Sequence, residues 1–289
     1  MATPKNTAVM LLSCPGSLAR KGAVAAISNF LIAHKGSILH ADDHQDTGLD
    51  LFLSRLEWDL TGFDIPFEDF DKQFKPVAVR FLMKYRLALT AYRPRVAVLV
   101  SSYDHCLADL LYRQHSGELG CEIPLIISNH SDGHRLAEFY GVPFHPTADA
   151  KDKSEAEQRI MALLGQHEID LVVLARYMQI LSSEFVQQFP WRIINIHHSF
   201  LPAFVGAKPY HQAFERGVKL IGATSHYVTA ALDEGPIIEQ DVVRVSHRDT
   251  VEDLIQKGRD LEKVVLSRAV RWHIENRILL YANKTVVFT

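Results

Sequence analysis

The order of the predicted elements indicates an α/β protein of two domains. The first part of the chain reads as strand, helix, strand, strand and helix, which is typical of an antiparallel sheet covered by helices on one face. The second part alternates short apolar runs with helical stretches, which favours a mostly parallel, doubly wound sheet. A polar segment with a proline separates them. We therefore expect domains over residues 1–88 and 95–289, joined by a linker over 89–94.

In the first part, the apolar run Ala8–Ser13 predicts a buried strand, which Cys14-Pro15-Gly16 ends. Apolar residues at helical spacing predict a helix over Lys21–His34. The remaining expected elements are strands at Ser37–His40 and Leu49–Glu57, a polar turn at Asp42–Asp46 and a helix at Phe67–Leu87, with a weakly marked last strand.

In the second part, continuous apolar runs predict strands that are covered on both faces. These runs are Val96–Ser101, Pro124–Ser128, Asp170–Ala175 and Arg192–Ile196, with helices expected at about 104–115, 133–140, 154–167 and 182–188. The end of the chain differs, because Ile221–Val228 and Pro236–Val245 look like an antiparallel edge. A long amphipathic helix at Asp249–Asn276 and a short strand at Thr285–Phe288 complete the prediction.

The composition excludes several classes of protein. A formal net charge of −3 gives no general attraction to nucleic acid or to an anionic membrane. The three cysteines, Cys14, Cys106 and Cys121, are odd in number and unpatterned, which argues against a disulfide framework and favours the cytoplasm. No apolar run approaches the roughly 20 residues of a membrane helix. The fifteen histidines contain no metal-ligand motif, so we expect no metal.

Polar groups suited to acyl-transfer chemistry lie at the end of the strand predicted over Arg192–Ile196. Asn195 and His197 alternate along extended chain and share a face, while the adjacent His198 points the other way. Asp233 and Gly235 lie in a loop further along. An acid, an imidazole and an amide are sufficient for acyl transfer without a metal, because one group moves protons and two stabilise an oxyanion.

These motifs resemble the folate-dependent formyltransferase family. The pattern Asn-x-His-x-Ser-x-Leu-Pro, followed by Asp-x-Gly-x-Ile, is similar to the family's own, and Ser128-Asn129, Leu174–Ser182 and Gly222–Val228 resemble family segments in family order. The resemblance covers roughly Arg95 to the C-terminus. It implies a Rossmann-like catalytic domain and a formyltetrahydrofolate as substrate, with no tightly bound cofactor.

The resemblance also implies roles for particular residues. Asn195 and His197 would stabilise the oxyanion, Asp233 would tune the histidine and shuttle protons, and His226 and Ser199 would support the site. Residues expected to contact the folate are Arg176, Tyr177, Met178, Ile180, Leu181, Val228, Thr229, Ala230 and Gly235.

Members of this family transfer the formyl group to an amine or to water. Enzymes that use a ribonucleotide amine carry a glycine-containing phosphate loop after the first strand. Here that loop, Ser101–Cys106, has no glycine and contains Asp104, which would repel a phosphate. The segment Gly206–His211 also resembles the hydrolytic branch, the formyltetrahydrofolate deformylases. Water is therefore the expected nucleophile. The alternatives are transfer to an amine such as glycinamide ribonucleotide, and a non-catalytic sensor of folate or amino acids.

The order of elements in the first domain resembles an ACT domain, a βαββαβ unit of ferredoxin-like type. ACT units pair side by side, which implies a homo-oligomer, a dimer of dimers or larger. They also bind amino-acid effectors at the loop after the first strand. Here that loop, Cys14–Gly22, lacks the usual acid, so the resemblance does not decide whether an effector binds. It still implies that the domains pair.

Overall fold

The computed structural model describes residues 6–202 and 209–289, which divide into two compact units. The first unit runs to Arg93 and includes Glu275–Tyr281 and Val286–Thr289; the second holds Pro94–Ile274 and Ala282–Thr285. The expectation that everything after residue 95 forms one domain therefore needs correction. Leu279 and Phe288 of the C-terminal segments are buried in an apolar cluster with Leu11 and Leu53 of the first unit.

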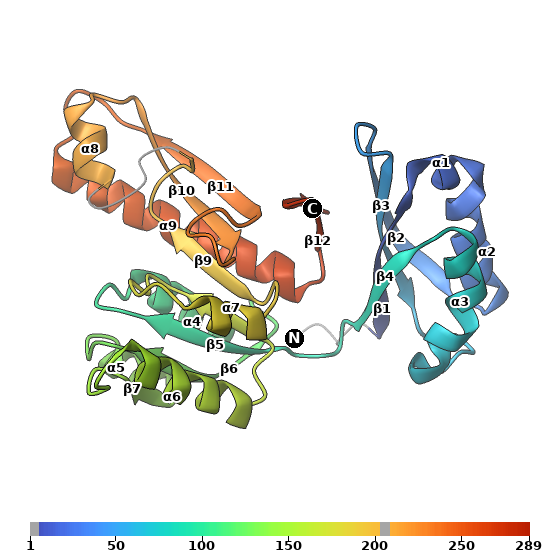
Figure 1. Ribbon diagram of the computed structural model, residues 1–289, viewed down its shortest axis with the longest axis horizontal. Coiled ribbons are helices and arrows are strands. Elements are labelled where there is room, and N and C mark those ends of the chain that lie inside the picture. Colours follow the sequence, from blue (N-terminus) through green and yellow to red (C-terminus); the bar gives the residue numbers. More distant parts are fainter. Residues whose placement is uncertain (1–5, 203–208) are drawn as a thin grey trace. The chain divides into compact units, whose positions relative to one another are not determined.

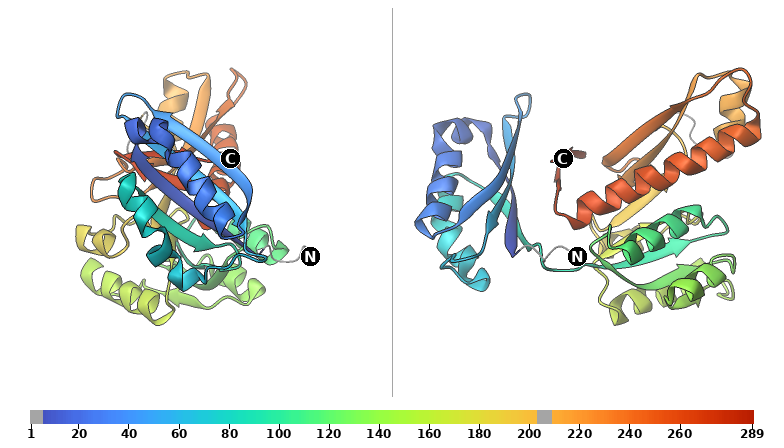
Figure 2. Two further views of the ribbon diagram at one scale, coloured as in Figure 1. Left: turned by 90° about the vertical axis from the view of Figure 1, so that its right-hand side faces the viewer. Right: turned by 180° about the vertical axis from the view of Figure 1, so that it is seen from behind.

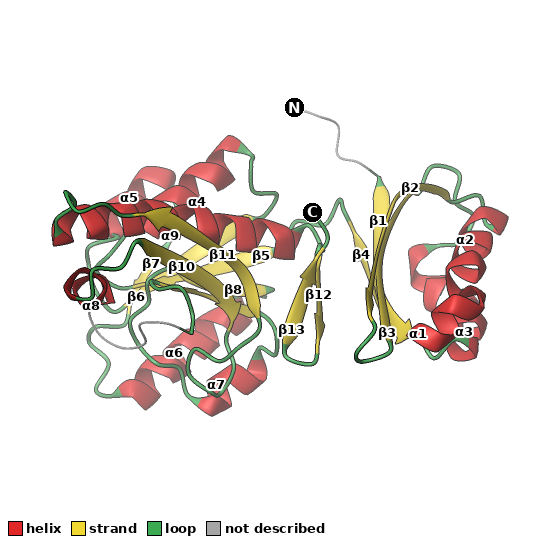
Figure 3. Cartoon of the chain, turned by 90° about the horizontal axis from the view of Figure 1, so that it is seen from above, coloured by secondary structure: helices red, strands yellow, loops and turns green. Residues whose placement is uncertain are grey.

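The first unit is a four-stranded antiparallel sheet with helices on one face (Figures 1 and 3). The strand order is β2-β3-β1-β4. Its strands are β1 (Thr7–Pro15), β2 (Ser37–Asp46), β3 (Leu51–Asp59) and β4 (Lys84–Leu89). Its helical elements are α1 (Gly16–Leu18), η1 (Ala19–Ala23), α2 (Val24–Ala33), η2 (Phe67–Asp69) and α3 (Phe70–Arg80).

Aromatic packing holds these helices on the sheet. Trp58 of β3 is fully buried and stacks on Phe70 of α3, with ring centroids 5.5 Å apart. Phe30 of α2 packs edge-on against the same Phe70 ring at 5.6 Å. Gly22, with a φ of 105°, breaks the helix that the sequence predicts as continuous over residues 21–34.

Two predictions for this unit are wrong. The polar stretch expected as a turn, 42–46, is the second half of β2, an edge strand whose side chains are nearly all exposed. Charged residues on an edge strand discourage pairing with other chains, so polarity here marks an edge rather than a turn. The helix expected over 67–87 ends at Arg80, because the chain turns at Leu82 (φ 50°) and continues as β4.

The second unit is built on a seven-stranded sheet in the order β11-β10-β9-β8-β5-β6-β7. Strands β7, β6, β5, β8 and β9 are parallel, and β10 and β11 form an antiparallel edge; the sequence predicts all of these strands except β7. The strands of this sheet are β5 (Arg95–Val100), β6 (Glu122–Ser128), β7 (Phe144–Pro146), β8 (Leu171–Leu174), β9 (Ile193–His197), β10 (Leu220–Tyr227) and β11 (Ile237–Arg244). Outside this sheet, β12 (Ile278–Tyr281) pairs with β13 (Lys284–Val287) in a two-stranded sheet.

Helices cover both faces of this sheet. Figure 3 shows α4, α5 and α9 on one face and α6 and α7 on the other, and Figure 2 shows α9 running along β10 and β11. Among the described residues, no helix is both long and apolar enough to span a membrane. The helices are α4 (His105–Ser116), α5 (His134–Tyr140), α6 (Lys153–Gln166), α7 (Ser183–Gln188), α8 (Pro209–Glu215) and α9 (Val251–Ile274).

The sheet has a topological switch point between β5 and β8. The chain leaves β5 toward β6 on one side, and later returns through β8 to β9 on the other side. In open α/β sheets, ligands bind at the carboxyl ends of strands next to such a point. The loops after β5, β8 and β9 are therefore the place to look for a site.

Candidate active site

The end of β9 places an amide and an imidazole beside the neighbouring antiparallel strand. Asn195 and His197 lie on β9, opposite His226 and Thr224 of β10 respectively. The side chains of His197 and His226 are buried, with 8% and 2% of their area exposed. A polar pair this buried requires partners, because an unpaired buried polar group is costly.

The loop after β10 supplies those partners through a tight backbone turn. Asp233 adopts a left-handed conformation (φ 56°), which directs the following residues back toward β10. Tyr227 donates its backbone N–H to the carbonyl of Pro236 at 3.0 Å. A Cβ on Gly235 would lie 1.7 Å from the Tyr227 carbonyl oxygen. Glycine at 235 is therefore required for this close approach.

Four of the expected site residues converge in this way. Nδ1 of His197 lies 3.3 Å from Oδ2 of Asp233, and Nε2 of His226 lies 3.6 Å from Oδ1 of the same carboxylate. Nδ2 of Asn195 lies 3.2 Å from Nε2 of His226. We call Asn195, His197, His226 and Asp233 the His197 cluster.

The hydrogen bonds of the cluster assign the ring protons. Nδ1 of His226 lies 3.0 Å from the Tyr227 carbonyl oxygen, which can only accept, so Nδ1 carries the proton. Nε2 of the same ring lies 3.2 Å from Nδ2 of Asn195 and 3.6 Å from Oδ1 of Asp233. Hydrogen bonds from His197 and His226 hold the pKa of Asp233 well below its ordinary value, despite partial burial. The carboxylate is therefore charged at neutral pH.

His197 keeps one ring nitrogen for a further partner. With Nδ1 turned to Asp233, Nε2 is buried and has no hydrogen-bond partner among the described residues. Such a group is expected where a bound substrate completes the arrangement. The cluster thus offers a fixed anion, an imidazole oriented by that anion, and an amide with a free N–H. This arrangement can move a proton and stabilise an oxyanion.

The segment expected to contact the folate, 176–181, lies after β8. The side chains of Met178 and Ile180 are exposed, whereas those of Tyr177 and Leu181 pack against the core below α6 and α7. Burial raises the pKa of the Tyr177 hydroxyl. Among the residues of this segment expected to contact the folate, Met178 and Ile180 are therefore the ones whose side chains are free to meet a ligand.

The other expected supporting residues lie around the loop after β10. Val228 packs against the same core as Leu181, and Thr229 donates its hydroxyl to the Ala231 carbonyl at 3.0 Å. Ala230 is exposed in this loop. Ser199 is buried, and its carbonyl accepts from the Thr224 hydroxyl at 2.9 Å. These contacts fix the backbone on both sides of the His197 cluster.

A second polar cluster, which the sequence analysis did not find, lies along the same strand ends. Its centre is Glu262 of α9, of whose side chain 1% is exposed. Glu262 accepts from His105 Nε2 at 2.7 Å and from the Tyr210 hydroxyl at 2.6 Å, and Arg176 Nε lies 3.5 Å away. We call His105, Arg176, Tyr210 and Glu262 the Glu262 cluster.

Electrostatics show that the Glu262 carboxylate is charged. Burial alone would raise its pKa, but the hydrogen bond from His105, the Arg176 charge and the hydrogen bond from Tyr210 bring it below the ordinary value. Burial, then the charge of Glu262, raises the pKa of the Tyr210 hydroxyl. The cluster is therefore a buried ion pair of Glu262 and Arg176, to which His105 and Tyr210 add further hydrogen bonds.

Three side chains in this region carry atoms that could act as metal ligands. His105, Cys106 and Glu262 each place a ligand atom within 4.8 Å of the others. Arg176 already brings a positive charge to the same carboxylate. Burial and the nearby Glu262 charge raise the pKa of the Cys106 thiol, which disfavours the thiolate that a metal needs. The chemistry of this group suits the arginine better than a metal ion.

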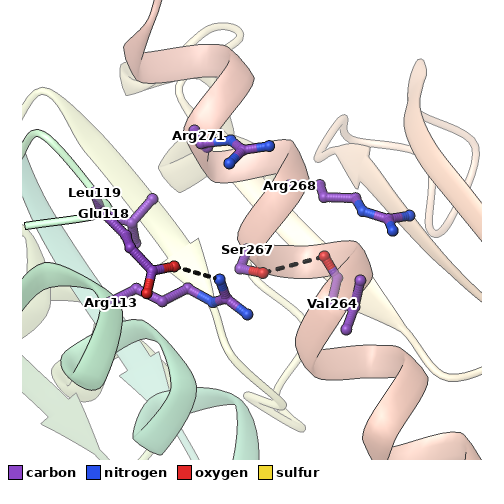
Figure 4. Close-up of a pocket in the computed structure, with 7 residues that line it drawn as sticks. All are labelled: Arg113, Glu118, Leu119, Val264, Ser267, Arg268 and Arg271. Carbon is purple, nitrogen blue, oxygen red and sulfur yellow. Dashed lines mark hydrogen bonds and ion pairs between the residues drawn. The ribbon is translucent and has the colours of Figure 1, made fainter. Parts of the chain in front are cut away.

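A separate pocket between α4 and α9 gathers arginine side chains (Figure 4). Arg113 donates to Asp109 and to Glu118, each at 2.7 Å, and Arg268 donates to Asp241 at 3.1 Å. Since these guanidinium groups have carboxylate partners, they are explained as partly exposed ion pairs of a helix surface. We assign no function to this pocket.

Part of the sequence evidence lies outside the described residues. Of the segment 206–211, Gly206, Ala207 and Lys208 are not described, while Pro209 begins α8. The side chain of Tyr210 packs over Gly258 of α9, where a Cβ would lie 2.1 Å from its hydroxyl oxygen. Glycine at 258 therefore allows Tyr210 to reach Glu262.

Comparison with known proteins agrees with this geometry. A family model described as "Formyl transferase" matches residues 94–270, which include both clusters. The chain is 55% identical to a formyltetrahydrofolate deformylase of Synechocystis sp., over 98% of each chain.

Solved structures give the same result. The crystal structure of a formyltetrahydrofolate deformylase from Pseudomonas syringae pv. tomato is 49% identical and superposes with a TM-score of 0.94, covering 100% of this chain and 96% of that one. A glycinamide ribonucleotide transformylase from Symbiobacterium toebii is 33% identical with a TM-score of 0.66, and covers 71% of this chain and 98% of its own. The similarity to the deformylases thus extends over both units.

Proposed function

Because the chain belongs to the formyl transferase family and, within it, to the formyltetrahydrofolate deformylases, we propose that it hydrolyses 10-formyltetrahydrofolate to formate and tetrahydrofolate. The observation that carries the proposal is the pairing of His197 with Asp233, 3.3 Å apart, in a chain matched to deformylases over its full length. This reaction would supply formate to one-carbon and purine metabolism and balance the folate pool.

Each member of the His197 cluster has a proposed role. The Asp233 carboxylate orients a water molecule and takes its proton as the water oxygen attacks the formyl carbon. The Asn195 amide and the protonated His197 ring stabilise the resulting oxyanion. The bond between the formyl carbon and N10 then breaks, N10 takes up the proton, and formate leaves. His226 positions Asn195 and Asp233 by contacting both.

Folate binding is proposed at the loops that flank this cluster. The exposed Met178 and Ile180, with the backbone from Arg176 to Leu181, would form one wall. The backbone of Val228, Thr229 and Ala230, with the close turn at Gly235, would form the other. The reaction needs no tightly bound cofactor and no metal, since the cluster supplies its own charge and proton donors.

The N-terminal unit is proposed to be an ACT domain that pairs copies of the chain. Its strand order and one-sided helices support this assignment. In the loop after β1, Ser17 donates its backbone N–H to Asp50 at 3.3 Å, and Arg20 lies 3.4 Å from the same carboxylate. Asp50, in the connection between β2 and β3, thus places a carboxylate beside this loop, which contains no acidic residue. We also propose that an amino-acid effector binds at this loop. We propose further that the chain forms a homo-oligomer, a dimer of dimers or larger.

We place the protein in the cytoplasm. Cys14, Cys106 and Cys121 are buried and are not joined in a disulfide. Cysteines that form no disulfide are typical of a reducing compartment.

Formate release without an amine tests the proposed function. The purified protein is mixed with 10-formyltetrahydrofolate, and formate and tetrahydrofolate are measured together. We expect both in equal amounts at an enzymatic rate. Release that requires an amine would make the protein a transferase, and folate binding without release would make it a sensor.

A further inference from the structure

We propose that the Arg176 side chain determines which nucleophile this site accepts, by filling the crevice at the switch point and leaving room for water alone. The inference rests on the proposed hydrolysis. It concerns the Glu262 cluster, which the mechanism above does not use.

Arg176 stands at the switch point itself. It follows β8, and its carbonyl accepts from the backbone N–H of Ser101, which follows β5, at 3.3 Å. Met178 donates its backbone N–H to the Ser101 hydroxyl at 3.0 Å. The ends of β5 and β8 are therefore joined directly, and Arg176 follows β8 at the end of the sheet where open α/β sheets bind their ligands.

Neighbouring side chains hold the Arg176 guanidinium in this crevice. It lies over the ring of Tyr103, with Cζ 5.4 Å from the ring centroid, and pairs with Glu262. Arg259 lies over the same ring at 5.3 Å. The Arg176 side chain is 9% exposed.

This arrangement is unfavourable for the fold, which indicates a functional reason for it. Arg176 adopts a left-handed conformation, with φ 63°, that residues other than glycine, asparagine and aspartate rarely adopt. Its Nε and Nη1 are buried and have no hydrogen-bond partner in the part of the chain that the structure describes. Glu262 meanwhile has two better-placed donors in His105 and Tyr210. Features that oppose stability are concentrated at functional sites.

A continuous line of contacts connects Arg176 with the reacting groups. The rings of His197 and His198 are 5.4 Å apart, and those of His198 and Tyr210 are 6.2 Å apart. Tyr210 in turn donates to Glu262, the partner of Arg176. Burial, followed by the Arg176 charge, lowers the pKa of His198 to about 4, which agrees with their proximity. The crevice that Arg176 fills is therefore next to the His197 cluster.

The two outcomes at this crevice differ only in the nucleophile. With water, oxygen bonds to the formyl carbon, the bond to N10 breaks, N10 gains a proton and formate is released. With a primary amine, nitrogen bonds to the formyl carbon and loses a proton, the bond to N10 breaks, N10 gains a proton and a formamide is released. Opening the crevice should admit the second reaction.

The test is the ratio of formamide to formate in the presence of glycinamide, a small primary amine. Arg176→Gly removes the side chain and suits the left-handed backbone, and Tyr103→Ala loosens the crevice from an exposed position. Glu168→Gly is the matched control, because Glu168 also has a positive φ, of 48°, but precedes β8 at the opposite end of the strand. Folding of each variant is checked by circular dichroism.

We expect Arg176→Gly to raise the ratio at least tenfold over wild type, Tyr103→Ala to raise it less, and Glu168→Gly to leave it unchanged. An unchanged ratio in folded Arg176→Gly would overturn the inference. If that variant does not fold, an unchanged ratio in Tyr103→Ala overturns it instead. Wild-type formate release without amine separates this result from a failure of the proposed function.

Discussion

Two polar clusters lie along one edge of the same sheet, and they are built differently. The His197 cluster holds a charged carboxylate between two imidazoles and leaves Nε2 of His197 for another partner. In the Glu262 cluster, the carboxylate has a complete set of donors from the protein itself. The comparison teaches that a buried carboxylate can orient a side chain for a substrate, as Asp233 does for His197, or can be held by donors of the protein alone, as Glu262 is.

The largest expected effect comes from breaking the His197 cluster at its charge. Asp233→Asn keeps the shape but removes the carboxylate that orients His197, so we expect kcat to fall by about 10²–10⁴-fold. The measurement is formate release from 10-formyltetrahydrofolate. Asp241→Asn changes a partly exposed acid on β11 that pairs with Arg268; it is the matched control and should keep wild-type kcat. A kcat for Asp233→Asn within a few-fold of wild type would remove Asp233 from the mechanism.

The same change in the Glu262 cluster should act on stability. Glu262→Gln leaves the buried Arg176 charge without its partner, and we expect a loss of about 3 kcal/mol of unfolding free energy. This loss corresponds to a thermal midpoint lower by roughly 6–12 °C. Glu252→Gln, on an exposed turn of the same helix, is the control and should leave the midpoint unchanged. Equal midpoints for the two variants would show that the cluster does not stabilise the fold.

His198 lies between the clusters and should give a pH-dependent effect. Its pKa is lowered from 6.5 to about 4 in the folded protein, so the unfolded chain binds more protons between these values. His198 therefore destabilises the folded state progressively as pH falls from 6.5 to 4, by roughly 2–3 kcal/mol in total.

In His198→Gln this pH-dependent loss should disappear. The thermal midpoint of the variant should fall less than that of wild type between pH 7 and pH 4. His247→Gln, at an exposed position, is the control and should follow wild type. Parallel curves for His198→Gln and wild type would place His198 in contact with water in the folded state.

The smallest effect is expected at a polar residue on the same edge that belongs to neither cluster. Ser182 caps α7 by accepting the Phe185 backbone N–H at 3.1 Å and also donates to Glu157. Ser182→Ala should cost about 1 kcal/mol of stability. Ser183→Ala is the control, and both variants should keep wild-type kcat. A large loss of activity in Ser182→Ala would extend the active site beyond the His197 cluster.

The sequence predicts the two clusters unequally, for a physical reason. The residues of the His197 cluster lie on paired strands and the loop that follows, so short-range alternation and motif spacing bring them together. Glu262 is 157 residues from His105 and 52 from Tyr210, and no local pattern relates them. One indication was present: Glu262 shares the apolar face of the predicted helix, where an acid requires a buried partner.

Parts of the fold, like the two clusters, differ in how far the sequence predicts them. The parallel strands were predictable because continuous apolar runs mark strands covered on both faces. The second half of β2 and the first residues of β4 were not predictable. The former is an exposed edge, and the latter continues an amphipathic stretch after the turn at Leu82. The burial of Leu279 and Phe288 in the first unit depends on contacts between the two ends of the chain, which periodicity does not report.

The central claim is that water attacks the formyl carbon at the His197 cluster. Turnover of 10-formyltetrahydrofolate in ¹⁸O-labelled water, without any amine, tests it most directly, with mass spectrometry of the formate. The account predicts one labelled oxygen in each formate, formed with an equal amount of tetrahydrofolate, and turnover at least about 10²-fold slower in Asp233→Asn. Formate without the label, or labelled formate formed equally fast by Asp233→Asn, would contradict it.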